Sequence, residues 1–346
     1  LQMRVYIHIP FCASKCPYCA FGSVTSLDLI KQYFKALELD LKTQLQNLNA
    51  QKIKSVFIGG GTPSVVNAKF YEPIFMLLAP FLSKNAELTS EANPNSLNLK
   101  WLENMRAFGL NRIRIGSQSF NEKKLKFLGR NHSPKDTFKA VEYAKIAGFT
   151  NINVDLMYAS KLDDKKMLKS ELENIKKLQI SHISAYALSL EKNTPFFGHN
   201  EYKKDSPRLA KYLFSGLCGL GLRQYEISNF GRVCKHNLGY WRGDDYIGVG
   251  AFSVGTLGFR RFNAPRSLNA YIKNPNFKNI ELLSKVQKDF ERVFLGLRCI
   301  LGVEKNIIKN KTNLKILLEN AKLRQNKTRV YNDNFLLADE LAGFLF

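Results

Sequence analysis

Short runs of β-forming residues alternate with longer helical patterns through more than half of this chain. Six runs have the composition of strands, at 4–9, 53–58, 87–91, 111–115, 151–155 and 182–188. Their starts lie roughly 25 to 50 residues apart, which leaves room for a helix between consecutive strands. Successive βα units of this kind build a parallel sheet with helices packed on it. The alternation therefore predicts an α/β fold, either an open sheet or a barrel.

The stretch 27–48 illustrates the helices expected between the strands. Five apolar residues recur there at steps of three and four, which places them on one face of a helix. Asp28, near the start of the stretch, is a candidate for capping the helix or matching its dipole. The five apolar residues are Ile30, Phe34, Leu37, Leu41 and Leu45.

Polar residues and glycines cluster directly after the strand-like runs. A cysteine group follows the first run, and the glycine-rich stretch 59–63 follows the second. Glu91 ends the third run, Gln118 follows the fourth and Asp155 ends the fifth. In barrels and open α/β sheets, sites are built at the carboxyl ends of the strands. The five positions therefore predict one shared pocket.

The cysteine group has the spacing Cys12-x3-Cys16-x2-Cys19 and lies in the loop after the first strand. Three thiolates can hold three corners of a 4Fe-4S cubane and leave the fourth iron open to a non-protein ligand. The alternative is a zinc site closed by His8, since structural zinc normally has four protein ligands. His8 lies within an alternating strand, however, which is more typical of a packed strand histidine.

The net charge is unusual, with 52 Lys and Arg against 29 Asp and Glu, or +23. Such an excess suits an acidic partner, and nucleic acid, an anionic membrane surface and a polycarboxylate ligand all qualify. Segment 305–329 holds eight basic residues and one acid, Glu319. Nucleic-acid association through this segment is an alternative function, although no recognition motif accompanies it and we expect no nucleic-acid partner. Peripheral contact with a membrane stays open.

The pattern changes near residue 265 to a shorter, helix-rich segment without further motifs. We therefore predict a first domain over 1–265 and a helix-rich second domain over 266–346. No apolar run approaches the ~20 residues that span a bilayer, and the N-terminal segment lacks the pattern of a secretory signal. These observations predict a cytoplasmic protein.

The motif Cys-x3-Cys-x-Tyr-Cys at 12–19 resembles the signature of the radical S-adenosylmethionine (SAM) enzymes. The resemblance implies an open partial barrel of (βα)6 type and a 4Fe-4S cluster whose open iron is chelated by the methionine part of SAM. It also implies that reduction of the cluster splits the sulfonium to a 5′-deoxyadenosyl radical, chemistry that belongs to the cofactor. The residues implied to contact SAM are Tyr6, Tyr18, Gly60, Gly61, Thr62, Glu91, Gln118, Arg130 and Asp155.

Longer matches resemble the HemN-like branch of this superfamily and cover most of residues 4–253. This branch contains two activities. One is the oxygen-independent coproporphyrinogen III oxidase, which oxidatively decarboxylates two propionates. The other is that of the HemW heme chaperones, thought to bind heme and deliver it to acceptor proteins. The matching stretches are EANP at 91–94, QSF at 118–120, LGRNH at 128–132, HISAY at 182–186 and YEISNF at 225–230.

Three features favour the chaperone over the oxidase. The oxidase pattern has a further cysteine two positions after the third, where this chain has Phe21, and a long segment ahead of Cys12 that is not seen here. The stretch HNLGYW at 236–241 resembles the chaperone's His-Asn-x-x-Tyr-Trp heme-binding motif. Imidazole can ligate heme iron and aromatic rings can cover a porphyrin face, and Cys234 is an alternative ligand. The resemblance thus implies heme contacts by His236, Asn237, Tyr240 and Trp241, with His236 as axial ligand.

We therefore expect a heme chaperone that carries a 4Fe-4S cluster and SAM, with the oxidase as the alternative and heme as cargo. The sequence identifies neither the heme acceptor, nor the electron donor, nor the oligomeric state. Two departures from the family pattern put the rim of the pocket in question. The chain has Ala159, Ser160 and Lys161 where the family continues Gly-Leu-Pro, and Val254 where relatives tend to carry histidine.

Overall fold

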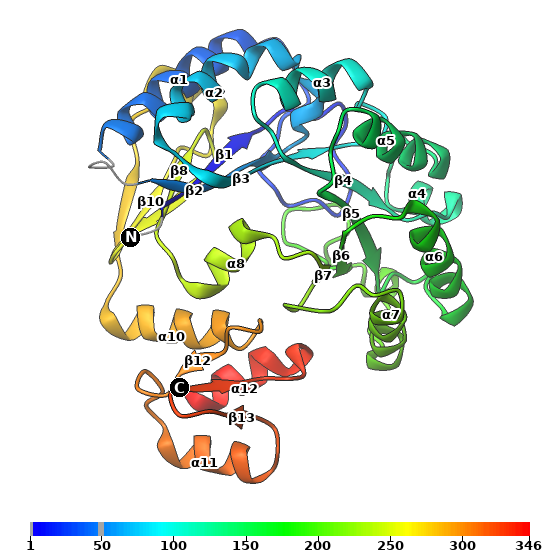
Figure 1. Cartoon of the computed structure of the whole chain (residues 1–346), viewed down its shortest axis with the longest axis vertical. Helices are drawn as coiled ribbons and strands as arrows, with labels where there is room; N and C mark the ends of the chain where they lie inside the picture. The colour runs from blue at the N-terminus through cyan, green and yellow to red at the C-terminus, as the bar shows by residue number, and fades with distance from the viewer. Residues whose placement is uncertain (1–2, 48–51) are drawn as a thin grey trace.

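One curved sheet of eleven strands forms the main part of the computed structural model, which describes residues 3–47 and 52–346 (Figure 1). Its order is β11-β10-β9-β8-β1-β2-β3-β4-β5-β6-β7. Strands β1 to β6 are parallel neighbours, and each contains one of the six predicted runs or most of it, so the predicted strands are confirmed. Their bounds are β1 (Met3–Ile9), β2 (Ile53–Gly60), β3 (Leu82–Ala92), β4 (Arg112–Gln118), β5 (Ile152–Tyr158) and β6 (His182–Ala187).

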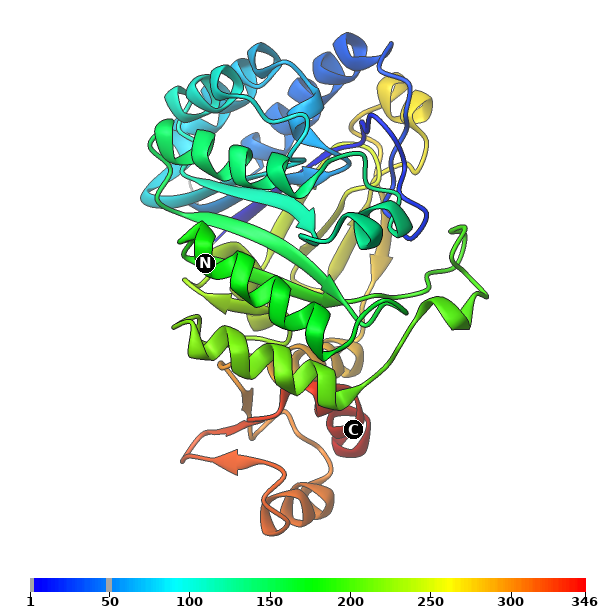
Figure 2. The same cartoon turned by 90° about the vertical axis from the view of Figure 1, so that its right-hand side faces the viewer.

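Helices between these strands cover the outer, convex face of the sheet (Figure 1). Each crossover returns the chain to the same face, which is why the next strand runs parallel to the last. Figure 2 shows α6 and α7 side by side in front of the strands. The helices are α1 (Ile30–Gln46), α2 (Glu72–Leu78), α3 (Leu99–Ala107), α4 (Glu122–Phe127), α5 (Pro134–Ile146), α6 (Lys165–Leu178) and α7 (Pro207–Gly219).

Helix α1 confirms the predicted apolar stripe and corrects its start. Four of the five stripe residues are buried against the sheet, and Ile30 is partly buried. The helix begins at Ile30, and the prediction that Asp28 caps it was wrong. The Asp28 carboxylate instead accepts a hydrogen bond from Ser26 Oγ (2.7 Å) in the preceding loop. Leu48, at the end of the predicted stretch, lies outside the described residues.

The sheet stays open, as predicted. At one edge β7 (Asn229–Gly231) pairs antiparallel with β6. On the other side β8 (Tyr246–Val249) runs parallel to β1 and is followed by the antiparallel strands β9 (Val254–Leu257), β10 (Arg260–Asn263) and β11 (Asn279–Leu282). The main sheet thus continues past residue 265, and the division of the chain into domains there stays a prediction.

A second apolar core holds together the helix-rich C-terminal part, shown in orange to red in Figure 1. It contains α10 (Lys285–Gly296), α11 (Lys311–Glu319) and α12 (Ala338–Leu345), with a small sheet of β12 (Val303–Glu304), β14 (Arg329–Tyr331) and β13 (Arg324–Gln325). Backbone hydrogen bonds join it to the barrel, including Ile227 N–H to the Arg298 carbonyl (2.8 Å). No helix in the described ranges is long and apolar enough to cross a membrane.

Candidate functional site

The three clustered cysteines lie half-buried in the loop that follows the carboxyl end of β1. The loop is closed by a backbone hydrogen bond from Cys12 N–H to the Val24 carbonyl (2.9 Å). Throughout residues 3–47 and 52–346, no three His, Cys, Asp or Glu side chains are grouped closely enough to hold a metal ion. Thiolates that each bind a different iron of a cubane need not converge on one point. Three thiolates in one loop are a donor set that fits a 4Fe-4S cluster.

His8 gives the zinc alternative no fourth ligand. Its Nδ1 is hydrogen-bonded to the Tyr6 hydroxyl (2.9 Å), and its Nε2 lies 2.7 Å from the Gly22 carbonyl oxygen. Burial lowers the pKa of His8 to about 4, so the ring is neutral near pH 7. With both ring nitrogens engaged, His8 is a packed strand histidine.

The glycine-rich turn after β2 packs directly against the cysteine loop. Thr62 N–H donates to the Phe11 carbonyl (2.7 Å), and the Thr62 hydroxyl donates to Cys12 Sγ (3.6 Å). A Cβ atom on Gly61 would lie 2.6 Å from the Phe11 carbonyl oxygen, and Gly60 has φ of +111°. Only glycine permits both the close approach and the backbone conformation. The turn therefore fixes the position of the cysteine loop, while its contact with SAM stays a prediction.

Arg130 lies beside one cysteine of the loop. Its Nη1 donates to Cys16 Sγ (3.4 Å), and its Nη2 donates to the Gly116 carbonyl (2.6 Å) and to Asn93 Oδ1. Tyr18 lies close to the same guanidinium, and burial raises the pKa of this phenol. Arg130 and Tyr18 therefore lie beside Cys16, while their contact with SAM stays a prediction.

Glu91 and Asp155 converge on Arg114, a residue that was not predicted from the sequence. Arg114 Nε donates to both carboxylate oxygens of Asp155 (2.8 and 2.9 Å), and its Nη1 lies 3.2 Å from Glu91 Oε1. Its Nη2 donates to the Tyr186 hydroxyl. Burial raises the pKa of Glu91, while Arg114 opposes that shift. The sequence pattern that could have pointed to Arg114 is the alternation RIRI at 112–115, because it places two arginines on one face of β4.

The remaining predicted SAM residues lie around the same strands but are less closely linked. The Tyr6 ring stacks on Phe57 with 6.4 Å between centroids. Gln118 ends β4 with φ of 70°, a left-handed conformation that is uncommon for a non-glycine residue. In the described part of the chain its side chain makes no hydrogen bond. Its contact with a nucleoside stays a prediction.

His236, the predicted axial heme ligand, lies in the first turn of α8 (Lys235–Arg242) and is fully buried. Its Nδ1 is hydrogen-bonded to Ser55 Oγ (2.9 Å) and its Nε2 to the Tyr240 hydroxyl (2.8 Å). Burial lowers the pKa of His236 well below its usual range. Iron ligation by His236 stays a prediction, and it requires the ring to give up one of these hydrogen bonds.

Cys234, the alternative iron ligand, is buried immediately before α8 and donates to Glu87 Oε1 (3.4 Å). Burial raises its pKa to about 12. Because iron binds the thiolate, this thiol is a poor ligand in its present surroundings. Asn237 and Trp241 are half-buried on α8, and the role of both in heme binding stays a prediction.

Helix α8 lies near the amino ends of the strands. Glu87 accepts from the His236 N–H (3.1 Å). Arg4, at the start of β1, donates to Ser55 Oγ (3.1 Å) and pairs with Asp244 just after the helix (2.6 Å). The cysteine loop follows the opposite, carboxyl end of β1. The two predicted sites therefore lie towards opposite ends of the sheet.

Comparison with known proteins agrees with this architecture. The family model of the Radical SAM superfamily matches residues 6–178. The heme chaperone HemW of Lactococcus lactis is 34% identical over 348 residues, covering 95% of this chain and 90% of the relative. HemW of Escherichia coli is 35% identical over 267 residues, covering 74% of this chain and 71% of the relative. The chain belongs to the HemW family of the radical SAM superfamily.

The fold of this HemW family member is also similar to a solved structure. Coproporphyrinogen III oxidase (HemN) from Escherichia coli superposes with a TM-score of 0.82, covering 99% of this chain and 90% of that chain. At 19% identity the similarity concerns the fold alone. The resemblance stated from the motifs, and the open radical SAM fold expected from it, are thus confirmed.

The departures from the family pattern have local structural consequences. Ala159 has φ of 62°, a left-handed conformation that glycine adopts without strain. The Ser160 N–H and hydroxyl both donate to Asp163 Oδ2 (2.8 and 2.7 Å). Lys161 Nζ lies 4.4 Å from the centre of the Tyr202 ring. Side-chain contacts therefore hold this part of the rim, while Val254 pairs with Asn263 between β9 and β10.

Glu226 gives the fold a pH dependence that can be measured. Its Oε2 accepts from the Ser228 N–H (3.2 Å), and its Oε1 has no partner among the described residues. Burial raises the pKa of Glu226 from 4.5 to about 7. The unfolded chain therefore loses this proton at lower pH than the folded chain. The free energy of unfolding falls as the pH rises from 4.5 to about 7.

We expect Glu226→Gln to remove the loss of stability that wild type shows as the pH rises. The variant should be more stable than the wild type by on the order of 3 kcal/mol at pH 8, and equal to it near pH 4. Urea unfolding at pH 5, 6, 7 and 8 measures the difference. Glu173→Gln, on the exposed face of α6, is the control and should show no such trend. A constant difference between Glu226→Gln and wild type across this range would contradict the assignment.

Proposed function

We propose that this protein is a heme chaperone, which binds heme and transfers it to an acceptor protein. Relatives named HemW are 30–35% identical over most of the chain, which supports this function. The observation that carries the proposal is the position of the His236–Trp241 motif on α8, away from the cysteine loop. A cargo held there does not have to reach the radical site. A cytoplasmic location is part of the proposal.

The cysteine loop would hold a 4Fe-4S cluster through Cys12, Cys16 and Cys19, with SAM beside it. When bound, these cofactors supply one-electron chemistry. The residues of the chain position them: the turn at Gly61 holds the loop, and Arg130 donates to Cys16. Arg114 pairs with the carboxylates of Glu91 and Asp155 near the same end of the sheet.

A second candidate is the oxygen-independent oxidation of coproporphyrinogen III. This chain shares the fold of HemN, with a TM-score of 0.82. This reaction needs the substrate propionates at the carboxyl ends of the strands, near the cysteine loop. It therefore predicts a substrate site at the other end of the sheet from α8.

One anaerobic experiment separates the two functions. After iron-sulfur reconstitution, hemin is titrated into the full chain, and the absorbance of the bound porphyrin is followed with and without SAM. We expect saturable binding of hemin and its release to added apomyoglobin, which serves as a generic acceptor. Absence of saturable binding would overturn the chaperone function. Release of 5′-deoxyadenosine with decarboxylation of coproporphyrinogen III would establish the oxidase instead.

A further inference from the structure

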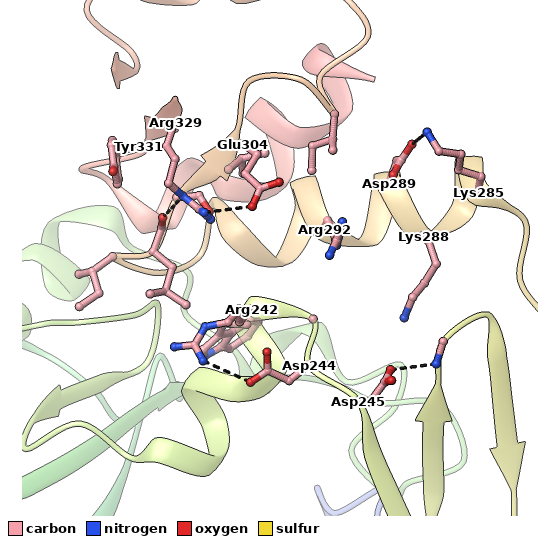
Figure 3. A pocket seen from close by; sticks show the side chains of 18 of the residues that line it. Arg242, Asp244, Asp245, Lys285, Lys288, Asp289, Arg292, Glu304, Arg329 and Tyr331 are labelled. Atoms are coloured by element: carbon pink, nitrogen blue, oxygen red, sulfur yellow. Dashed lines mark hydrogen bonds and ion pairs between the residues drawn. The ribbon is translucent and has the colours of Figure 1, made fainter. Parts of the chain in front are cut away.

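A pocket of about 760 Å³ opens between the barrel and the C-terminal part, within the range of about 300–1,000 Å³ typical of ligand sites. The end of α8 and the segments around β8 to β10 form one wall. Helix α10 and the strands β12 and β14 form the other (Figure 3). Trp241, the last residue of the α8 motif, is the motif residue that lines this pocket.

Apolar surface is exposed inside this pocket. Phe259 and Ile300 line it and are 54% and 47% exposed. Leu301, Ile307 and Trp241 extend the same lining. Exposed apolar surface that gathers in a concave site marks a binding surface, and an aromatic pair suits a flat, conjugated ligand.

Two cations of the pocket have no acidic partner among the described residues. Three ion pairs join six of its charged side chains: Arg242 with Asp244 (3.3 Å), Lys285 with Asp289 (3.6 Å), and Arg329 with Glu304 (3.3 Å). The carboxylate of Asp245 accepts from the Gly258 N–H (2.9 Å).

Lys288 and Arg292 remain, and neither lies within 4 Å of a carboxylate in the described ranges. They are four residues apart on α10 and so share one face of the helix. Figure 3 shows Lys288 extending from α10 towards the opposite wall, where Asp245 lies, with Arg292 further along the same helix. The pocket thus combines two unpaired positive charges with an apolar, partly aromatic surface.

We propose that this pocket binds heme as a flat apolar dicarboxylate, with Lys288 and Arg292 pairing with its two propionates. The inference rests on the proposed chaperone function and names the place where the cargo is held. A free phosphate would use the cations but not the apolar walls. The macrocycle lies against Trp241 and Phe259.

Recognition at this site does not depend on iron. Of the described residues that line the pocket, none is a histidine, cysteine or methionine. Metal-free protoporphyrin IX, which has the same two propionates and the same flat ring, should therefore bind with an affinity close to that of hemin. Hemin dimethyl ester, which has lost both carboxylate charges, should bind more weakly.

The test is a titration of the full chain with hemin, protoporphyrin IX and hemin dimethyl ester. The double variant Lys288→Glu with Arg292→Glu should weaken hemin binding by about tenfold or more, since it places like charges against the propionates. The control is Lys322→Glu with Lys327→Glu, which makes the same charge change on exposed residues away from the pocket. It should leave the affinity unchanged.

A thermodynamic cycle adds a readout that misfolding cannot imitate. The charge reversal should affect hemin strongly and the dimethyl ester little, because the ester has no carboxylates to repel. Equal hemin affinity in wild type and double variant would overturn the site and leave the chaperone function standing. Equal weakening of hemin and ester would also overturn the propionate assignment. A wild-type chain that binds no hemin would contradict the chaperone function itself, and the site with it.

Discussion

Replacing Lys124 by alanine is expected to lower the free energy of unfolding by about 3 to 5 kcal/mol. Lys124 lies on α4 with no exposed side-chain surface. Its Nζ donates to Asp163 Oδ1 (2.7 Å) and to the Met157 carbonyl (2.6 Å), and it lies 3.7 Å from Glu171 Oε1. Without the ammonium, two carboxylates remain buried with no positive partner in contact. Leaving buried carboxylates without a positive partner costs more free energy than losing the hydrogen bonds of Lys124 alone.

Urea unfolding of Lys124→Ala measures this effect. Lys126→Ala, an exposed lysine of the same helix, is the control and should change stability by less than about 0.5 kcal/mol. In an Asp163→Asn background the cost of Lys124→Ala should shrink, because the carboxylate in closest contact is then neutral. A cost below about 1 kcal/mol for Lys124→Ala alone would refute the assignment. The ion cluster also ties α4, which precedes Arg130, to the loop after β5.

The barrel could be predicted from the sequence because its signal is local. Each strand carries its own apolar, β-branched run, and each helix carries its own stripe, as α1 does. The carboxyl ends of parallel strands necessarily share one edge of the sheet. Cys12, Glu91 and Asp155 could therefore be assigned to one region from the order of the strands alone. The start of α1 was wrong because Ser26, a neighbour in the loop, binds the carboxylate expected to cap the helix.

The partners of buried charges could not be predicted, because they are far apart in sequence. Arg114 and Asp155 are separated by 41 residues, and Lys124 and Asp163 by 39. Alternation places Arg114 on a face of β4 but does not say which carboxylate it meets. The unpaired state of Lys288 and Arg292 is likewise a property of the assembled pocket. In the sequence alone, nothing distinguishes these two residues from the other lysines and arginines, which number 52 in all.

The charge of the chain illustrates the same limit. Segment 305–329 stands out in the sequence for its density of basic residues. That segment contributes α11 and β13 to the C-terminal part, and three of its basic residues form ion pairs, with Glu319, Asp333 and Glu304. The unpaired cations that face a cavity lie on α10 instead. Local charge density therefore identified a basic surface, whereas the candidate ligand contacts depend on which charges the fold leaves without a partner.

Replacing Cys16 by serine is expected to abolish the iron-sulfur cluster. A serine hydroxyl is a poor substitute for a thiolate, and two remaining cysteines leave a cubane with two iron atoms lacking a protein ligand. After anaerobic reconstitution, bound iron should fall from about four atoms per chain to less than one. Cys218→Ser removes an exposed cysteine of α7 and should keep full iron content and cluster absorbance. Unchanged iron content in Cys16→Ser would rule out this loop as the cluster site.

The same variant tests how independent the two ends of the barrel are. Cys16 lies after the carboxyl end of β1, while α8 and the pocket lined by Trp241 lie near Arg4 at its amino end. Hemin affinity should therefore stay within about twofold of the wild type in Cys16→Ser, because mutations at distant sites have nearly independent effects. If hemin binding is lost together with the cluster, the cargo is held near the cysteines, and the placement of heme at the α10 pocket is wrong.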